Sequence, residues 1–262
     1  MFPTLRPFAA VLACACAAGF LSLPARADEP SVIRVAIDDT EQYFTAPLRW
    51  DAEDWTIAGI AVAAVASSHA LDSRVRDHFV PAAGGLNGGK DSNSARDALP
   101  SLALIGGTFV VAGFLNDMDG YKETLRLIEA GVFSTLTAEA LTLAAGRERP
   151  DATTSPNQWR KGGDSFPSVH ASAAFAIGMT FAESGNDDYR WMRRILGYTV
   201  AAGTAYIRIK NNDHWLSDTV AGSAIGMATA RFVLNRENGG QGQIAFAPQK
   251  GGWLLSYSAP LH

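Results

Sequence analysis

The chain has 262 residues, of which 47% are hydrophobic and 18% are charged, and its formal charge is -4 at pH 7. This length is ample for one buried core, and the 25 glycines and 12 prolines follow no repeat, which excludes collagen, a coiled coil and bulk disorder. A net acidic chain without a basic block lacks the electrostatic footprint of a nucleic-acid-binding protein, so we expect no nucleic-acid partner.

Residues 1–27 are predicted to be a signal peptide. Arg6 precedes an apolar stretch from Pro7 to Pro24, and Ala25-Arg26-Ala27 has the small-x-small form of a cleavage site. Cleavage there removes both cysteines, Cys14 and Cys16, which excludes a disulfide, a cysteine nucleophile and a cysteine-ligated zinc in the exported protein. The alternative is a lipoprotein signal with Cys14 as the lipidated residue.

Six apolar segments, separated by polar loops, are predicted to be helices. Alanine, leucine, isoleucine, valine, glycine and phenylalanine dominate them, which favours helix. In chain order they are Trp55 to Leu71, Ala98 to Asn116, Ala130 to Gly146, Ser165 to Ala182, Ile195 to Ile207 and Thr219 to Ala230. We therefore expect an all-α fold, a helical bundle of about six core helices.

The segment from Ala98 to Asn116 alone has the length and the lack of charge to cross a bilayer, which takes about 20 apolar residues. The other segments have shorter uncharged runs, which are more typical of buried core helices. The chain then divides into a signal peptide (1–27), an N-terminal extension (28–54), a helical domain (55–236) and a C-terminal tail (237–262).

Two regions outside the helices need an interpretation. The loop from Gly84 to Lys90 has the glycine and lysine spacing of a phosphate-binding P-loop, but Asp91 stands where Ser or Thr must hold magnesium, and no strand precedes it. We therefore expect no nucleotide there. The tail from Gln243 to Tyr257 alternates in polarity around Gly251-Gly252, which predicts a short hairpin packed on the bundle.

The residues with chemical potential are concentrated between positions 142 and 218, in three clusters at predicted helix boundaries. The clusters are Gly146-Arg147-Glu148-Arg149-Pro150, Ser165-Phe166-Pro167-Ser168-Val169-His170, and the stretch from Arg208 through His214 to Asp218. Helix boundaries let a bundle present these side chains at one end while the helices fix their geometry.

These clusters contain the parts of an oxyanion site. Arg149 and Arg208 offer planar guanidinium forks that suit a phosphate. Pro167-Ser168 at a helix start adds free backbone N–H groups and the positive end of the helix dipole. Two arginines and a helix terminus at one place would be costly without a bound anion.

The same clusters supply a nucleophile and an acid. His170 and His214 are titratable near neutral pH, and Asp218 lies one helical turn after His214. A bond from Asp218 to one ring nitrogen would fix the tautomer and leave the other nitrogen free to attack phosphorus. The inventory is that of a metal-free phosphoryl transferase with a histidine nucleophile, and we expect no cofactor.

The pattern resembles the type-2 phosphatidic acid phosphatase superfamily, which shares its helical fold with vanadium haloperoxidases and bacterial class A acid phosphatases. The family signature is K-x6-R-P, P-S-G-H and S-R-x5-H-x3-D. Here it reads Thr142-x6-Arg149-Pro150, Pro167-Ser168-Val169-His170 and Ile207-Arg208-x5-His214-x3-Asp218, with every spacing kept. The resemblance covers residues from about 100 to 235 and implies the family's helical fold.

Carried over by position, the resemblance implies three catalytic residues. His214 would be the nucleophile that forms a phosphohistidine, Asp218 its orienting partner, and His170 the general acid that later activates water. The phosphate oxygens would be held by Arg149, Arg208, Ser168 and the backbone N–H of Val169. No metal is implied.

Three positions depart from the signature: Thr142 replaces lysine, Val169 glycine and Ile207 serine. Losing a cation from the phosphate cradle would cost about 1.5–3 kcal/mol. Arg147 is the candidate replacement cation, so Arg147 and Thr142 are accessory positions. Together the departures leave open a catalytically degenerate site that only binds phosphate or a lipid phosphate, and they disfavour vanadate-dependent peroxidation.

Topology decides which substrates reach the site. With an exported amino terminus, a periplasmic site needs an even number of membrane crossings before Arg149, so the first apolar segment lies against the bundle or no helix spans. We expect an inner-membrane protein with its site facing the periplasm, acting on a lipid phosphate or an isoprenyl diphosphate. The alternative is a soluble periplasmic acid phosphatase for small phosphomonoesters. The sequence gives no oligomeric state.

Overall fold

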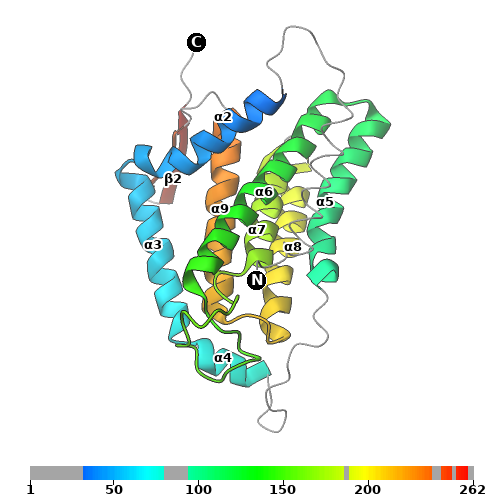
Figure 1. Cartoon of the computed structure of the whole chain (residues 1–262). Helices are drawn as coiled ribbons and strands as arrows, with labels where there is room; N and C mark the ends of the chain where they lie inside the picture. Colours follow the sequence, from blue (N-terminus) through cyan, green and yellow to red (C-terminus); the bar gives the residue numbers. More distant parts are fainter. Residues whose placement is uncertain (1–31, 80–93, 186–188, 238–242, 250–251, 259–262) are drawn as a thin grey trace.

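The computed structural model describes residues 32–79, 94–185, 189–237, 243–249 and 252–258, and within these ranges the chain is a helical bundle with one hairpin (Figure 1). The elements are α2 (Val32–Thr45), the 3-10 turn η1 (Ala46–Arg49), α3 (Ala52–His69), α4 (Asp72–Phe79), α5 (Ser94–Leu115), α6 (Met118–Ala145), α7 (Val169–Glu183), α8 (Arg190–Lys210), α9 (Leu216–Glu237), β1 (Gln243–Gln249) and β2 (Gly252–Ser258). The all-α fold class is confirmed.

All six predicted helices are present, as α3 and α5 through α9. The largest difference is α6, which begins at Met118, twelve residues before the apolar run that predicted it. Asp117 caps it by accepting the backbone N–H of Asp119, and the charged turns that follow remain helical. Counting uncharged residues therefore underestimated its length.

Helices α2 and α4 were not predicted, because neither contains a long apolar run. α4 is eight residues long with the sequence DSRVRDHF, so polarity concealed it. The predicted hairpin is the antiparallel pair of β1 and β2, in which Gln243 faces Ser258. The predicted signal peptide, Cys14 and the P-loop-like stretch from Gly84 to Asp91 lie outside the described residues.

The helix α7 is the centre of the bundle and packs against α6, α8 and α9. Small residues make this close packing feasible. Gly222 of α9 lies so near α7 that a Cβ built on it would be 2.4 Å from the carbonyl oxygen of Ser168, and a Cβ on Gly226 would be 2.3 Å from that of Ser172. The two glycines therefore set the distance between the starts of α7 and α9.

The end of α2 packs on the bundle through Tyr43. Its ring stacks on Phe133 of α6, with centroids 4.7 Å apart, and meets Phe232 of α9 edge to face. Its hydroxyl lies 3.0 Å from Thr137 Oγ1 and 2.8 Å from Thr229 Oγ1. Part of the predicted N-terminal extension is thus tied to α6 and α9.

Among the residues that the structure describes, two helices are long and apolar enough to cross a membrane, over Arg96–Leu115 and Asp119–Ala145. The pair α3 and α4, bent by 54°, would make a third if it is one broken span. The expectation of a single such segment was wrong, because α6 continues beyond its apolar run. Only 28% of the first window and 50% of the second are buried. The large apolar side chains exposed on α3 and α5 include Trp55, Ile60, Val62, Phe109, Val111 and Phe114.

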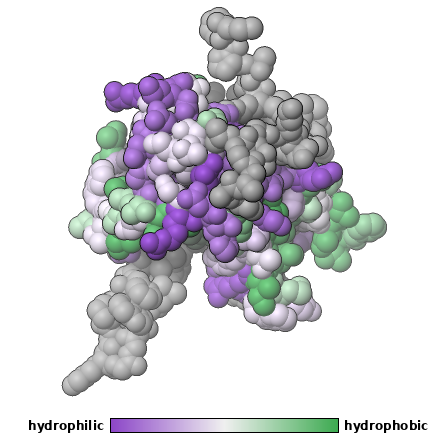
Figure 2. Space-filling view, turned by 90° about the horizontal axis from the view of Figure 1, so that it is seen from below, coloured by the Kyte–Doolittle hydropathy of each residue, from purple (hydrophilic) through white to green (hydrophobic). Residues whose placement is uncertain are grey.

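Seen from the end of the molecule where α4 lies, hydrophilic residues cross the middle of the surface and hydrophobic residues gather toward its margins (Figure 2). The molecule therefore has a polar end, and the helix sides next to it are apolar, as the lipid-facing surfaces of a membrane protein are.

Replacing Gly222 by alanine should loosen the α7–α9 contact. The added Cβ would meet Ser168 O, so we expect the free energy of unfolding to fall by about 1–3 kcal/mol, as in overpacked cores. Gly203→Ala on α8 is the matched control, because its Cβ would meet no described atom within 4 Å and should gain up to about 1 kcal/mol of helix propensity. Thermal unfolding in detergent measures both, and equal shifts would contradict the close approach.

Candidate active site

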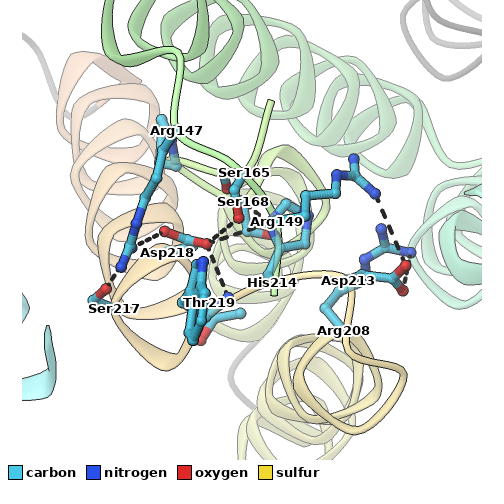
Figure 3. A network of polar contacts seen from close by, with 12 residues as sticks. Arg147, Arg149, Ser165, Ser168, Arg208, Asp213, His214, Ser217, Asp218 and Thr219 are labelled. Atoms are coloured by element: carbon cyan, nitrogen blue, oxygen red, sulfur yellow. Dashed lines mark hydrogen bonds and ion pairs between the residues drawn. The ribbon is translucent and has the colours of Figure 1, made fainter. Parts of the chain in front are cut away.

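Side chains from the end of α6, the following loop, the start of α7 and the α8–α9 turn converge at one end of the bundle (Figure 3). The chain leaves α6 through Gly146, whose φ of +53° belongs to the left-handed region and favours glycine. A Cβ there would also crowd Arg160 Cα and Gly162 N at 3.3 Å. This sharp exit directs Arg147 and Arg149 toward the starts of α7 and α9.

His214 lies in the turn between α8 and α9 and is 3% exposed. Its Nδ1 is 2.7 Å from the carbonyl oxygen of Ser165. A carbonyl can only accept, so Nδ1 carries the proton and the lone pair of the neutral ring is on Nε2. The ring is therefore held in the tautomer that can attack an electrophile through Nε2.

Asp218 contributes to this arrangement through Ser165. The predicted direct bond from Asp218 to the His214 ring was wrong in its geometry, because Asp218 Oδ2 is 3.8 Å from Nδ1. Oδ2 instead accepts the Ser165 hydroxyl and, at 2.9 Å, the backbone N–H of Trp215. The carboxylate thus fixes both the residue that orients the ring and the turn that carries it.

Arg208, in the last turn of α8, is fully buried. Its Nη1 contacts Asp97 of α5 and lies 3.1 Å from Asp213 Oδ2. Its Nε and Nη2 are buried and have no hydrogen-bond partner among the described residues. Buried guanidinium donors without partners are costly, and an oxyanion would satisfy them.

Arg149 lies on the other side of Asp213 (Figure 3). Its Nε and Nη2 donate to the two carboxylate oxygens of Asp164, at 2.6 and 3.1 Å, and its Nη1 is 3.8 Å from Asp213 Oδ1. The two arginines predicted to hold phosphate are thus brought together around Asp213, each with a carboxylate partner of its own.

The start of α7 supplies the remaining predicted elements. Ser168 is the buried N-cap, and its hydroxyl accepts the N–H of Ala171 at 3.4 Å. Its own N–H donates to the carbonyl of Asp218 at 3.0 Å, which joins α7 to α9. Val169 and His170 are the first two residues of the helix, so their N–H groups lie at the positive end of its dipole.

The departures from the signature have distinct surroundings. Thr142 is buried at the end of α6, and its hydroxyl donates to Ala138 O at 2.9 Å, with Pro167 O at 3.4 Å. It therefore lies beside the α7 start without offering a free donor. Val169 is 5% exposed, whereas Ile207 is 38% exposed on α8.

The structure does not support Arg147 as a replacement cation for the phosphate. Its Nη1 donates to Asp218 Oδ1 and its Nη2 to Asp72, with Pro156 O accepting from Nε at 3.0 Å. The guanidinium is fully buried on the side of Asp218 away from His214 (Figure 3). All its nitrogens are engaged behind the site, so it acts on Asp218.

Several residues of the site were missed by the sequence analysis. They are Asp72, Asp97, Asp164, Ser165 and Asp213. Asp213 and Ser165 lie inside the predicted clusters, so proximity to the motifs could have indicated them. Asp72 and Asp97 lie far upstream, and only the tertiary fold reveals them. His69, at the end of α3, lies beside Asp72, with Nδ1 2.9 Å from Asp72 Oδ2 and Nε2 2.9 Å from Asn157 Oδ1.

The electrostatic surroundings keep His214 neutral. Burial lowers its pKa well below 6.5, and the positive charges of Arg149 and Arg208 and the neighbouring His170 lower it further, against the bond to Ser165 O. A neutral ring with its lone pair on Nε2 is the nucleophilic form. Across the described residues no group of three or more His, Cys, Asp or Glu side chains is arranged to hold a metal ion.

Comparisons with known proteins identify the region that contains this site. Residues 123–238 match the family model described as the PAP2 superfamily. The matched segment contains all three motifs, and α3, α4 and α5 lie before it. Over 82 residues the chain is 39% identical to the lipid A 1-phosphatase of Porphyromonas gingivalis, a match that covers 31% of this chain and 16% of the relative.

A second relative is a PA-phosphatase related-family protein of Dictyostelium discoideum, 31% identical over 135 residues, or 45% of this chain and 49% of the relative. The chain thus matches less than half the length of either relative. A solved structure, a transmembrane PAP2 type phosphatidylglycerolphosphate phosphatase from Bacillus subtilis, aligns over 88% of this chain and 96% of its own with 15% identity. The TM-score of this alignment is 0.40.

Acidification should destabilise the protein through His214. Its folded pKa lies below that of the unfolded chain, so the stability it contributes is present above the unfolded pKa and is lost as the pH falls through the folded one. From pH 7.5 to 5.5 we expect wild type to lose about 1 kcal/mol more than His214→Asn. Denaturant unfolding of both proteins at the two pH values measures this, and parallel losses would contradict it.

Proposed function

We propose that this chain, whose residues 123–238 match the PAP2 superfamily model, is a member of that superfamily and a metal-independent phosphatase of lipid phosphates that works through a phosphohistidine. In this proposal the phosphatase-like domain spans residues 55–236, after a signal peptide (1–27) and an N-terminal extension (28–54) and before a C-terminal tail (237–262). The proposal is supported chiefly by two features of the described residues: His214 is fixed in one tautomer, and two buried donors of Arg208 have no hydrogen-bond partner among them.

The phosphate cradle would be completed by groups from three elements. Arg208 offers Nε and Nη2, Arg149 offers its guanidinium once a phosphate replaces Asp164 as its partner, and the α7 start offers the N–H of Val169 with the Ser168 N-cap. Such donors stabilise the charge on the equatorial oxygens as it develops in the transition state.

In the first step, Nε2 of His214 would attack phosphorus while the bond from phosphorus to the leaving oxygen breaks. His170, on the first turn of α7, would give its proton to that oxygen, so the alcohol or phosphate leaves neutralised. The Nδ1 proton of His214 stays on the ring and continues to bond Ser165 O. The ring is then cationic, and Asp218 is the nearest carboxylate, at 3.8 Å.

In the second step, His170, now neutral, would take a proton from water as the water oxygen attacks phosphorus. The bond from phosphorus to Nε2 breaks and its electron pair returns to the ring. Inorganic phosphate leaves, and both histidines recover their starting protonation. Every proton is accounted for by the two histidines and water.

The proposed substrate is a phosphate or diphosphate on a lipid. The exposed apolar sides of α3 and α5 and the two helices able to cross a membrane favour a site at a membrane surface, and the relative from Porphyromonas gingivalis is named a lipid A 1-phosphatase. We place the protein in the inner membrane with its site facing the periplasm; a soluble periplasmic acid phosphatase is the alternative.

One observation favours a second candidate, a site that binds phosphate without hydrolysing it. Thr142 stands where the signature has lysine, and its hydroxyl is used inside the fold. A cradle with one cation fewer would still hold an anion but would stabilise the transition state less.

The first experiment compares wild type with His214→Asn in detergent and excess chelator, using phosphatidic acid, an isoprenyl diphosphate and p-nitrophenyl phosphate. We expect wild type to release phosphate and the variant to lose at least about 1,000-fold of kcat, because it lacks the nucleophile. Protein incubated with 32P-labelled substrate and quenched in alkaline SDS should carry a label that is stable in alkali and lost in acid, and only in wild type. Phosphate binding without release or label would identify the binder.

A second variant tests the missing cation. Thr142→Lys should raise kcat/KM by about 10-fold or more, because a charge-assisted bond contributes about 1.5–3 kcal/mol. Thr142→Met is the matched control, since it adds similar length without charge and should give no gain. An unchanged rate for Thr142→Lys, in a protein that still folds, would show that the cradle does not need the cation.

A further inference from the structure

A buried carboxylate from α4 reaches the back of the candidate active site. Asp72 is 1% exposed and lies 146 residues before Asp218 in the sequence. Its Oδ1 accepts the backbone N–H of Ser217 at 2.8 Å, and its Oδ2 accepts the Ser217 hydroxyl at 2.7 Å and Arg147 Nη2 at 2.7 Å. Asp72 thus binds the residue that precedes Asp218 and the cation that binds Asp218.

Arg147 is the bridge between the two carboxylates. One of its terminal nitrogens contacts Asp72 and the other contacts Asp218, and the side chains of all three residues are fully buried. The Ser217 hydroxyl closes the cluster, because it accepts from Arg147 at 2.8 Å and donates to Asp72. The three side chains are therefore joined by direct contacts, and their formal charges sum to -1 once Asp218 is ionised, since burial raises the pKa of Asp218 to about 7.

This net charge has a consequence for His214. A single cation between two carboxylates neutralises neither completely, so Asp218 keeps part of its negative charge toward the ring. With Asp72 removed, Arg147 would be balanced by Asp218 alone. The ring of His214 becomes cationic only after it attacks phosphorus, so the charge acts in the reaction and not on substrate binding.

Stability alone is a weak reason for such a cluster, because well-packed apolar residues often stabilise a fold as well as a buried ion pair does. Moreover, α4 lies outside residues 123–238, the segment that matches the family, and it packs against α8 and α9. Near the cluster, His69 at the end of α3 contacts Asp72 and Asn157, which ties the same corner to the loop after α6.

We propose that Asp72 and Arg147 are positioning residues for the reaction, which hold Asp218 in place and preserve its charge, so that α4 is part of the catalytic unit. This inference rests on the proposed function and names further residues that the same site requires. Neither residue contacts the phosphate cradle; both act through Asp218 and Ser217.

The test compares wild type with Asp72→Asn, which keeps the shape of the side chain and removes its charge. We expect kcat to fall by about 10- to 100-fold, the loss typical when a residue that orients a functional group through a hydrogen bond is replaced. KM should stay within about 2-fold of wild type. Asp77→Asn is the matched control on the same helix, because Asp77 is 68% exposed and pairs only with Arg76 in the described contacts, and it should leave both constants unchanged.

The pH profile separates positioning from a merely structural role. The groups around His214 are Arg149, Arg208, His170, Asp218 and the carbonyl of Ser165. Removing the negative charge of Asp72 should leave the acid limb of kcat/KM at or below its wild-type pH, whereas Arg147→Gln should move it upward. If either substitution merely disrupted the site and let water in, the acid limb would move to higher pH in both variants, because solvation favours the charged ring of His214.

Each outcome decides the question. A kcat for Asp72→Asn within about 2-fold of wild type, or upward limbs in both variants with a lowered melting temperature, would overturn the proposal. If wild type shows no His214-dependent phosphate release, the proposed function fails, and 15N-histidine NMR still tests the positioning. In that case the pKa of His214 read from its resonance must lie at or below the wild-type value in Asp72→Asn and above that value in Arg147→Gln.

Discussion

The carboxylate of Asp218 holds together the segments that make the site. It accepts the Ser165 hydroxyl, the backbone N–H of Trp215 and Arg147 Nη1, which come from the loop before α7, from the α8–α9 turn and from the end of α6. Its own carbonyl accepts the N–H of Ser168. Because a buried carboxylate is costly unless it is fully hydrogen-bonded, these segments cannot separate without exposing an uncompensated charge.

Charge is arranged differently on the two sides of Asp218. Behind it, every nitrogen of Arg147 has a partner, and the cluster with Asp72 is closed. In front of it, Arg208 keeps two buried donors that have no partner in the described part of the chain, and Arg149 is paired with a partly exposed Asp164. The front is therefore ready to exchange partners for an oxyanion, whereas the back is fixed. Catalytic sites need this combination of a rigid support and unsatisfied donors.

The helices of the bundle form both the support of the site and an apolar outer surface. Small residues on α7 and α9 bring the helix starts close together, which places Ser168 beside Asp218. The outer sides of α3 and α5 carry apolar side chains and little charge. A polar end with apolar flanks would suit the proposed substrate, which has a phosphate head and a lipid tail, because each part would then meet a matching surface.

The sequence by itself determined the helices with long apolar runs and the motif residues, because periodicity and spacing are local properties. His214, Asp218, Arg149 and Arg208 were predicted from spacing, and the structure brings all four together. Local patterns also misled, since α6 is longer than its apolar run and α4 has none.

Tertiary structure alone decided which partner each charged group has. Ser165 O, not Asp218, binds the His214 ring, and Arg147 faces away from the cradle. Asp72 could not be predicted, because no spacing links a polar eight-residue helix to a motif about 145 residues downstream. Such pairings depend on how helices pack and on the requirement that each buried charge find a partner, and that requirement is met only in three dimensions.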